Sequence, residues 1–113
     1  MEERLGPCPS TPNCVSSLAD GDLHRIDPLP LPAGDPIDRI AEIVLSFPRT
    51  AVVERDDDYL HATFTSRVFR FVDDVEFLID RNAGVVHVRS ASRVGVGDMG
   101  VNRARVEAIR ARL

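Results

Sequence analysis

The sequence predicts an α+β fold: an antiparallel sheet of four to five strands in a meander, with two helices packed on one face, in the order β-α-β-β-β-β-α. Apolar residues recur at helical spacing in one segment before and one after a central region, and that region alternates apolar and polar residues as half-buried strands do. With 113 residues, 43% of them hydrophobic, the chain can build one hydrophobic core but not two. We therefore expect a single domain over residues 1–113, made of a proline-rich extended arm (1–34) and a helix-sheet-helix core (35–113).

The arm is marked by proline, because the first 36 residues hold seven of the eight prolines. That density excludes a helix and favours an extended segment, with at most an edge strand near Leu23–Ile26. Cys8 and Cys14 also lie in the arm, where they form a small disulfide loop in an oxidising compartment or stay as two thiols in the cytosol. Two cysteines do not complete a tetrahedral zinc site, so we predict no metal and no cofactor.

The first helix begins at Asp35-Pro36, where the carboxylate is the expected N-cap and the proline occupies the first turn. Pro48 ends it. Five apolar residues share one face at 100° per residue: Ile37, Ile40, Ala41, Val44 and Phe47. This amphipathic pattern predicts a helix that packs on the sheet.

Four strands are expected next: Thr50–Arg55, Tyr59–Thr65, Val68–Asp80 and Val85–Arg93. Ser66-Arg67 fits a two-residue hairpin turn, and residues 81–84 fit a four-residue turn. Pairing Thr65 with Val68 and Asp80 with Val85 puts the large apolar residues of the last three strands on one face. A second helix follows from Asp98 onward, with Val106, Ile109 and Leu113 on one stripe.

Charge excludes several classes of function. The net charge is −4, from 14 basic and 18 acidic residues, which disfavours general nucleic-acid binding. All the basic residues are arginine, so lysine Schiff-base chemistry is excluded.

No apolar run reaches the ~20 residues that span a bilayer. The start of the chain lacks a signal-peptide pattern, so we expect a cytoplasmic protein, or an exported one if an N-terminal segment has been removed.

Asp73 is the most informative candidate, because its parity in the strand points its carboxylate into the apolar face. A buried carboxylate needs a dedicated partner or a raised pKa. The predicted register brings Ser90 and Ser92 to the same face, and an arginine from the last helix can join them. The alternative is a bulge at Val72-Asp73 that turns Asp73 and Asp74 to solvent.

Asn102 extends the stripe of the last helix backwards and also needs partners when buried. We expect its amide to serve loop carbonyls in its own first turn. The preceding glycine-rich loop, Gly95–Gly100, is flanked by Arg93 and Arg103 and is a weak candidate to hold a carboxylate or phosphate. Asp98 is expected to cap the helix there and thus to compete with an external anion.

On the opposite face of the sheet, Asp74 and Glu76 are expected beside Arg89 and Arg93. Such a charge ladder usually contributes little stability when it is solvated. The histidines lie on unrelated segments, and no Ser-His-Asp arrangement emerges from order or spacing.

Three stretches carry a resemblance: residues 8–17 (CPSTPNCVSS), 71–77 (FVDDVEF) and 89–103 (RSASRVGVGDMGVNR). Together they resemble the domain-of-unknown-function family 1499, found in bacteria and photosynthetic organelles, over nearly the whole chain. The resemblance implies a fold-sized unit with no assigned reaction. It also implies an exported, lipid-anchored or lumenal setting, as for many relatives.

We therefore expect a non-enzymatic binding or interaction module with an Arg/Asp-rich polar cluster, whose partner is a small anionic ligand or a protein. The alternative is a small enzyme that uses Asp73 or Asp74 as general base on an anionic substrate held by Arg89, Arg93 or Arg103. A group of Asp73, Asn102 and Ser92 that merely locks the last helix to the sheet is a third possibility. An enzyme requires a concave pocket that contains one of these carboxylates free of arginine.

Overall fold

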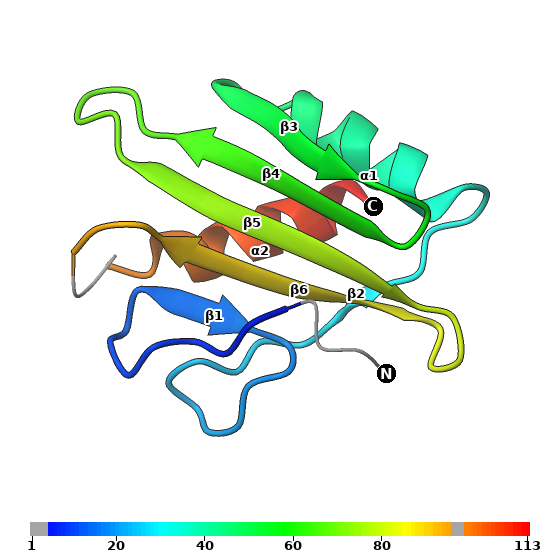
Figure 1. Cartoon of the computed structure of the whole chain (residues 1–113), viewed down its shortest axis with the longest axis horizontal. Coiled ribbons are helices and arrows are strands. Elements are labelled where there is room, and N and C mark those ends of the chain that lie inside the picture. The colour runs from blue at the N-terminus through cyan, green and yellow to red at the C-terminus, as the bar shows by residue number, and fades with distance from the viewer. Residues whose placement is uncertain (1–4, 96–98) are drawn as a thin grey trace.

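The computed structural model describes residues 5–95 and 99–113, and it has the predicted α+β architecture (Figure 1). Within these residues a six-stranded antiparallel sheet has the strand order β1-β6-β5-β4-β3, and β2 also pairs with β6. The strands are β1 (Cys14–Ser16), β2 (Leu29–Pro30), β3 (Thr50–Arg55), β4 (Tyr59–Thr65), β5 (Val72–Asp80) and β6 (Val85–Ser92). The helices are α1 (Pro36–Leu45) and α2 (Val101–Arg112).

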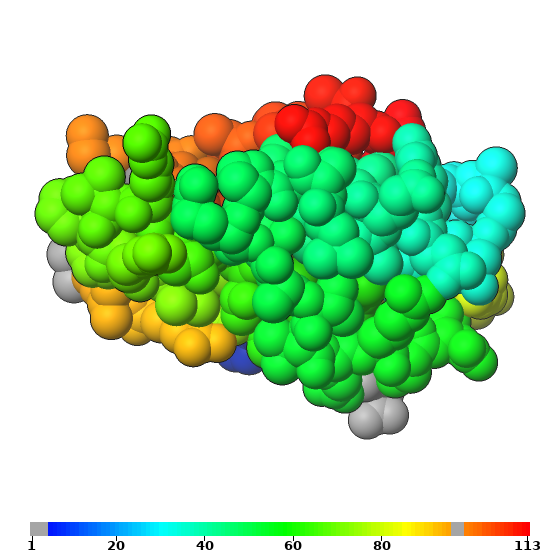
Figure 2. Space-filling model, turned by 90° about the horizontal axis from the view of Figure 1, so that it is seen from above, coloured from blue at the N-terminus to red at the C-terminus, as the bar shows by residue number. Residues whose placement is uncertain are grey.

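The first helix begins as its sequence predicts. The Asp35 carboxylate accepts hydrogen bonds from the backbone N–H groups of Ile37 (3.0 Å) and Asp38 (3.1 Å), and Pro36 occupies the first turn. The apolar side of α1 packs on the sheet, and α2 lies beside α1 on the same face (Figure 2).

One hydrophobic core lies between the sheet and the two helices, which confirms the predicted packing of both helices on one face. It joins residues of α1, α2 and the central strands, including Ile40, Val44, Leu60, Phe77, Val88, Val106 and Ile109. No helix among residues 5–95 and 99–113 has the length and apolar character needed to cross a membrane.

The β5–β6 hairpin has the predicted register, with Asp80 opposite Val85 and Asp73 opposite Ser92. The β4–β5 hairpin differs from the prediction. Ser66-Arg67 is not a two-residue turn; residues 66–71 form a longer loop, and Thr65 pairs with Val72 rather than Val68. The register shift is four residues, an even number, so every β5 side chain keeps its predicted face.

The edge strand expected near Leu23–Ile26 was wrongly placed. The edge of β6 that β5 leaves free is occupied by β1 and β2, which lie before and after that segment. Proline at position 30 is tolerated there because β2 is an edge strand. The Leu23–Ile26 segment instead bends back to β1, where Ser16 N–H donates to the carbonyl of His24 (2.8 Å) and Arg25 makes an isolated bridge with Ser16.

The N-terminal residues also cover part of the sheet face opposite the helices. Leu5 packs with Tyr59 of β4 and Leu78 of β5, and all three side chains are buried. The arm therefore lies partly over the face that the sequence predicted to be polar.

Candidate functional site

The predicted cluster around Asp73 forms on the helix side of β5. Asp73 is 7% exposed, and its carboxylate pairs with the guanidinium of Arg105 from α2 at 2.8 Å. Arg105 also lies over the ring of Phe64, 5.0 Å from its centroid, opposite Asp73 on β4. The bulge that would have turned Asp73 to solvent is absent from β5, whose pairing runs unbroken from Val72 to Leu78 along β4.

Asn102 completes this cluster. Its fully buried amide bonds to the sheet and the arm: Oδ1 accepts from Ser90 Oγ (2.6 Å) and Arg105 (2.9 Å), while Nδ2 donates to Ser92 Oγ (3.0 Å) and the carbonyl of Asn13 (3.2 Å). Gly100, in the left-handed conformation (φ 79°), precedes the helix, whose second residue is Asn102. One side chain thus joins α2, β6 and the arm.

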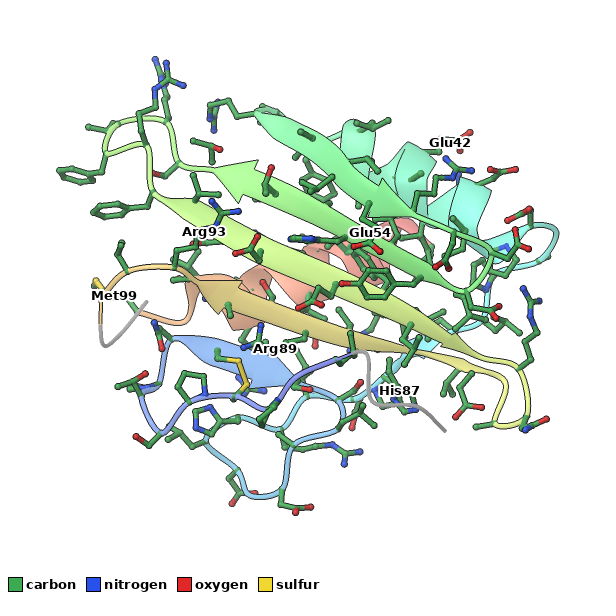
Figure 3. The ribbon with its side chains drawn as sticks, in the orientation of Figure 1. Glu42, Glu54, His87, Arg89, Arg93 and Met99 are labelled. Atoms are coloured by element: carbon green, nitrogen blue, oxygen red, sulfur yellow. A yellow bond between two sulfur atoms is a disulfide. The ribbon has the colours of Figure 1, made fainter. Side chains whose placement is uncertain are left out.

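On the opposite face, both predicted acids of the ladder are engaged by arginine. Arg93 binds Asp74 through two guanidinium nitrogens, at 2.8 and 2.9 Å, and this bond lowers the pKa of Asp74 below its ordinary value. Arg89 contacts Glu76 at 3.4 Å and also donates to the carbonyl of Pro7 (3.3 Å), so the arm closes over it. Figure 3 shows Arg89 and Arg93 on this face.

Two neighbours of the ladder were not predicted. His61 Nε2 lies 2.7 Å from Asp74, and the Tyr59 hydroxyl donates to Glu76 at 2.5 Å. Both residues lie on β4, which pairs with β5. Their positions beside Asp74 and Glu76 follow from the β4–β5 register, which can be derived only when the length of the loop between these two strands is known.

A serine, a histidine and an aspartate lie close together between the arm and the β5–β6 hairpin, an arrangement that their order and spacing in the sequence did not predict. Ser17 Oγ lies 3.1 Å from Nδ1 of His87, and Nε2 of His87 lies 3.4 Å from Asp80. A nucleophile must reach a substrate, but Ser17 is 3% exposed and its oxygen accepts the backbone N–H of Val88 (2.9 Å). This arrangement fastens the arm to β6.

The two arginines expected to flank an anion are already engaged. Arg93 binds Asp74, and Arg103 donates to the backbone carbonyls of Arg25 (2.8 Å) and Leu23 (3.4 Å). Asp98, the expected helix cap, lies outside the described residues.

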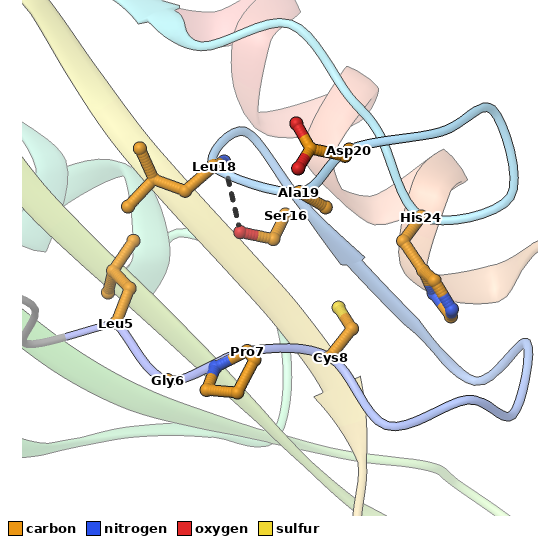
Figure 4. A pocket seen from close by; sticks show the side chains of 9 residues that line it. All are labelled: Leu5, Gly6, Pro7, Cys8, Ser16, Leu18, Ala19, Asp20 and His24. Carbon is orange, nitrogen blue, oxygen red and sulfur yellow. Dashed lines mark hydrogen bonds between the residues drawn. The ribbon is translucent and has the colours of Figure 1, made fainter.

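The arm lines an open pocket of about 460 Å³ between residues 5–8 and the end of β1 with the segment that follows it (Figure 4). A disulfide between Cys8 and Cys14 ties the wall formed by residues 5–8 to β1. In another wall of the pocket, His24 Nδ1 donates to the backbone carbonyl of Cys14 (2.9 Å). The lining residues are Leu5, Gly6, Pro7, Cys8, Ser16, Leu18, Ala19, Asp20 and His24.

In the part of the chain that the structure describes, no three His, Cys, Asp or Glu side chains gather closely enough to hold a metal ion.

A family model described as "Protein of unknown function (DUF1499)" matches residues 4–113, essentially the whole chain. The chain belongs to this family. No curated protein and no solved structure matches the chain.

Proposed function

We propose that this DUF1499 domain is a non-enzymatic binding module, and that its Arg/Asp-rich cluster serves the architecture. The observation that carries the proposal is that Asp73, Asp74 and Glu76 are each held by an arginine, at 2.8, 2.8 and 3.4 Å. A carboxylate bound in this way is a poor general base, because its lone pairs are engaged and its charge is stabilised.

The competing hypothesis is an enzyme in which Asp73 or Asp74 is the base and Arg89, Arg93 or Arg103 holds an anionic substrate. That mechanism would use arginines that already hold other groups. Arg93 engages Asp74 through Nε and Nη2, and Arg103 engages backbone carbonyls of the arm, so these groups compete with a substrate for the same guanidinium groups.

The pocket under the arm is the better candidate for a ligand site. Its volume, about 460 Å³, falls within the ~300–1,000 Å³ typical of small-molecule sites. Leu5, Pro7 and Leu18 give it apolar walls, while Asp20 and His24 supply a few polar groups. This combination favours a ligand with an apolar body and a single polar or charged group.

The disulfide supports the same assignment. By joining Cys8 to Cys14 it fixes one wall of the pocket against β1, and a pre-formed wall reduces the entropy lost on binding. A disulfide in so short a loop is also typical of an oxidising compartment, where we propose the protein acts.

Amide chemical-shift mapping tests the proposal with three probes that share a phenyl body: phenylacetate, phenethylamine and benzyl alcohol. We expect at least one probe to shift the amides of Leu18, Ala19 and His24. Leu18→Ala removes apolar wall and is expected to weaken binding about fivefold. Leu45→Ala, an equally conservative change on the exposed side of α1, is the control and leaves binding unchanged.

Two results overturn the proposal. One is the absence of shifts in the pocket with all three probes at millimolar concentration. The other is a set of shifts centred on Asp74, His61 and Arg93 that Asp74→Asn abolishes, which would favour the enzyme hypothesis.

A further inference from the structure

One end of the sheet exposes apolar side chains from two loops and from the first residue of α2. The loop between β4 and β5 and the loop between β6 and α2 lie at this same end, because β4 and β6 run parallel to each other on either side of β5 (Figures 1 and 2). Arg93 N–H donates to the carbonyl of Val72 (3.2 Å) and joins the bases of the two loops. We call the following side chains the apolar tip: Val68, Phe69, Phe71, Val94, Met99 and Val101.

These side chains are large and apolar, yet they lie outside the hydrophobic core and are about half exposed or more. Phe69 is 74% exposed, Val68 is 77% exposed and Met99 is fully exposed, projecting from the end of the molecule in Figure 3. The rings of Phe69 and Phe71 stack on each other with centroids 5.5 Å apart, outside the core. Large apolar groups gathered on one surface generally mark a site of interaction.

Within the β4–β5 loop the charges have one sign. Residues 66–71 contain two arginines, Arg67 and Arg70, and no acid. Neither guanidinium makes an ion pair or a hydrogen bond with any residue in the described ranges, and both residues are exposed. In a protein of net charge −4, two unpaired cations beside exposed rings form a local basic and apolar surface.

Two residues of the tip loops have an uncommon backbone conformation. The three residues other than glycine with positive φ in residues 5–95 and 99–113 are Arg49 (55°), Arg70 (57°) and Met99 (54°). Arg70 and Met99 lie in the two tip loops, and Arg49 lies beside them, where its side chain donates to the carbonyl of Thr65 (3.0 Å). The loop is closed by Ser66, whose N–H donates to the carbonyl of Phe71 (2.9 Å). Such strained conformations cluster at functional surfaces.

We propose that the apolar tip docks on the surface of an anionic phospholipid bilayer. The tip is a projecting end, and a deformable layer of headgroups accommodates a projection without a matching cavity. Phe69 and Phe71 then enter the boundary between headgroups and acyl chains, while Arg67 and Arg70 pair with lipid phosphates. The loop backbone carries polar groups that need water, which limits the insertion to this shallow depth.

Tryptophan fluorescence provides a direct test, because the chain contains no tryptophan. A Phe69→Trp variant reports the environment of the apolar tip without background. We expect its emission to shift to the blue with vesicles of phosphatidylcholine and phosphatidylglycerol (7:3), and to be quenched by lipids brominated near the headgroup. Leu45→Trp, at an exposed position of α1, is the control and does not respond.

Co-sedimentation with the same vesicles separates the two contributions. Phe69→Ser is expected to weaken binding about tenfold. Arg67→Gln with Arg70→Gln is expected to weaken it about 25-fold, at about fivefold for each arginine. Arg81→Gln, in the β5–β6 turn at the other end of the sheet, leaves binding unchanged. Raising the salt concentration weakens the wild type but has little effect on the double arginine variant.

Three results overturn the proposal: no response of Phe69→Trp to anionic vesicles, equal binding to vesicles of phosphatidylcholine alone, or wild-type binding by both tip variants. Self-association that Phe69→Ser abolishes, measured by light scattering without lipid, would reassign the apolar tip to a protein contact. These outcomes do not bear on the pocket under the arm, which is tested separately.

Discussion

Replacing Asp73 with alanine removes the carboxylate from the buried cluster and leaves Arg105 without its ionic partner. Both side chains are largely buried, at 9% exposed for Asp73 and 14% for Arg105. Removing one partner of a buried ion pair typically costs about 3–5 kcal/mol, because an uncompensated charge stays behind.

The structure places the expected cost at the low end of that range. Arg105 keeps the Oδ1 of Asn102 at 2.9 Å and the face of Phe64 at 5.0 Å, and these contacts partly stabilise its charge. We therefore expect Asp73→Ala to lower the free energy of unfolding by about 3 kcal/mol. For a domain of this size, that corresponds to a Tm lower by roughly 10–15 °C.

Urea unfolding followed by circular dichroism measures this difference. Asp74→Ala is the matched control: the neighbouring acid lies on the other face, pairs with the half-exposed Arg93, and is expected to cost about 1 kcal/mol or less. Arg105→Met should cost a similar amount to Asp73→Ala, and the double variant should cost less than the sum by about 1–3 kcal/mol. A stability of Asp73→Ala within about 0.5 kcal/mol of wild type would refute the reasoning, since such a small effect is typical of exposed sites.

Two further predictions concern the ladder and the disulfide. Arg93 holds the pKa of Asp74 below its ordinary value of 3.8, so the pair stabilises the fold fully above about pH 4, and this contribution is lost as the pH falls through the lowered pKa. The difference in unfolding free energy between wild type and Asp74→Asn should accordingly be larger at pH 7 than at pH 2.5, and an equal difference would contradict the assigned ion pair. Reducing the Cys8–Cys14 disulfide, whose cysteines are six apart in sequence, should lower the free energy of unfolding by about 2 kcal/mol. The Cys8→Ser, Cys14→Ser variant should match the reduced protein and not respond to reductant.

The sheet residues of the buried cluster could be predicted, because their positions depend on the β5–β6 hairpin, and the sequence indicates the length of its turn. Residues 81–84 set the pairing of β5 with β6, and that pairing put Asp73 opposite Ser92. Since side chains alternate faces along a strand, the burial of Asp73 followed from parity alone.

The β4–β5 hairpin shows what a periodic pattern does not reveal. Phe69 and Phe71 have the parity of core residues, yet they lie in a loop and are largely exposed. Alternation predicts a strand whenever apolar residues recur at every second position, and it does not distinguish a buried strand from an exposed loop with the same spacing. The faces of β5 were still correct only because the register error was an even number of residues.

The contacts of the arm could not be predicted from local patterns. Asn13 meets Asn102, and Ser17 meets His87, across some 70 to 90 residues of sequence. No spacing rule relates residues so far apart, so the arrangement of serine, histidine and aspartate emerged only from the structure.

Strand β6 pairs with strands from distant parts of the chain: β1 and β2, near the N-terminus, on one edge, and β5, which directly precedes it, on the other. During synthesis, the residues of β1 leave the ribosome roughly 70 residues before the strand against which they pair. Until then they have no template for their backbone hydrogen bonds, and such non-local pairing is intrinsically slow. The Cys8–Cys14 bond needs only a short loop and can close during this interval. The oxidation state met by the nascent chain thus decides whether the arm reaches the sheet as a preformed loop or as an open strand.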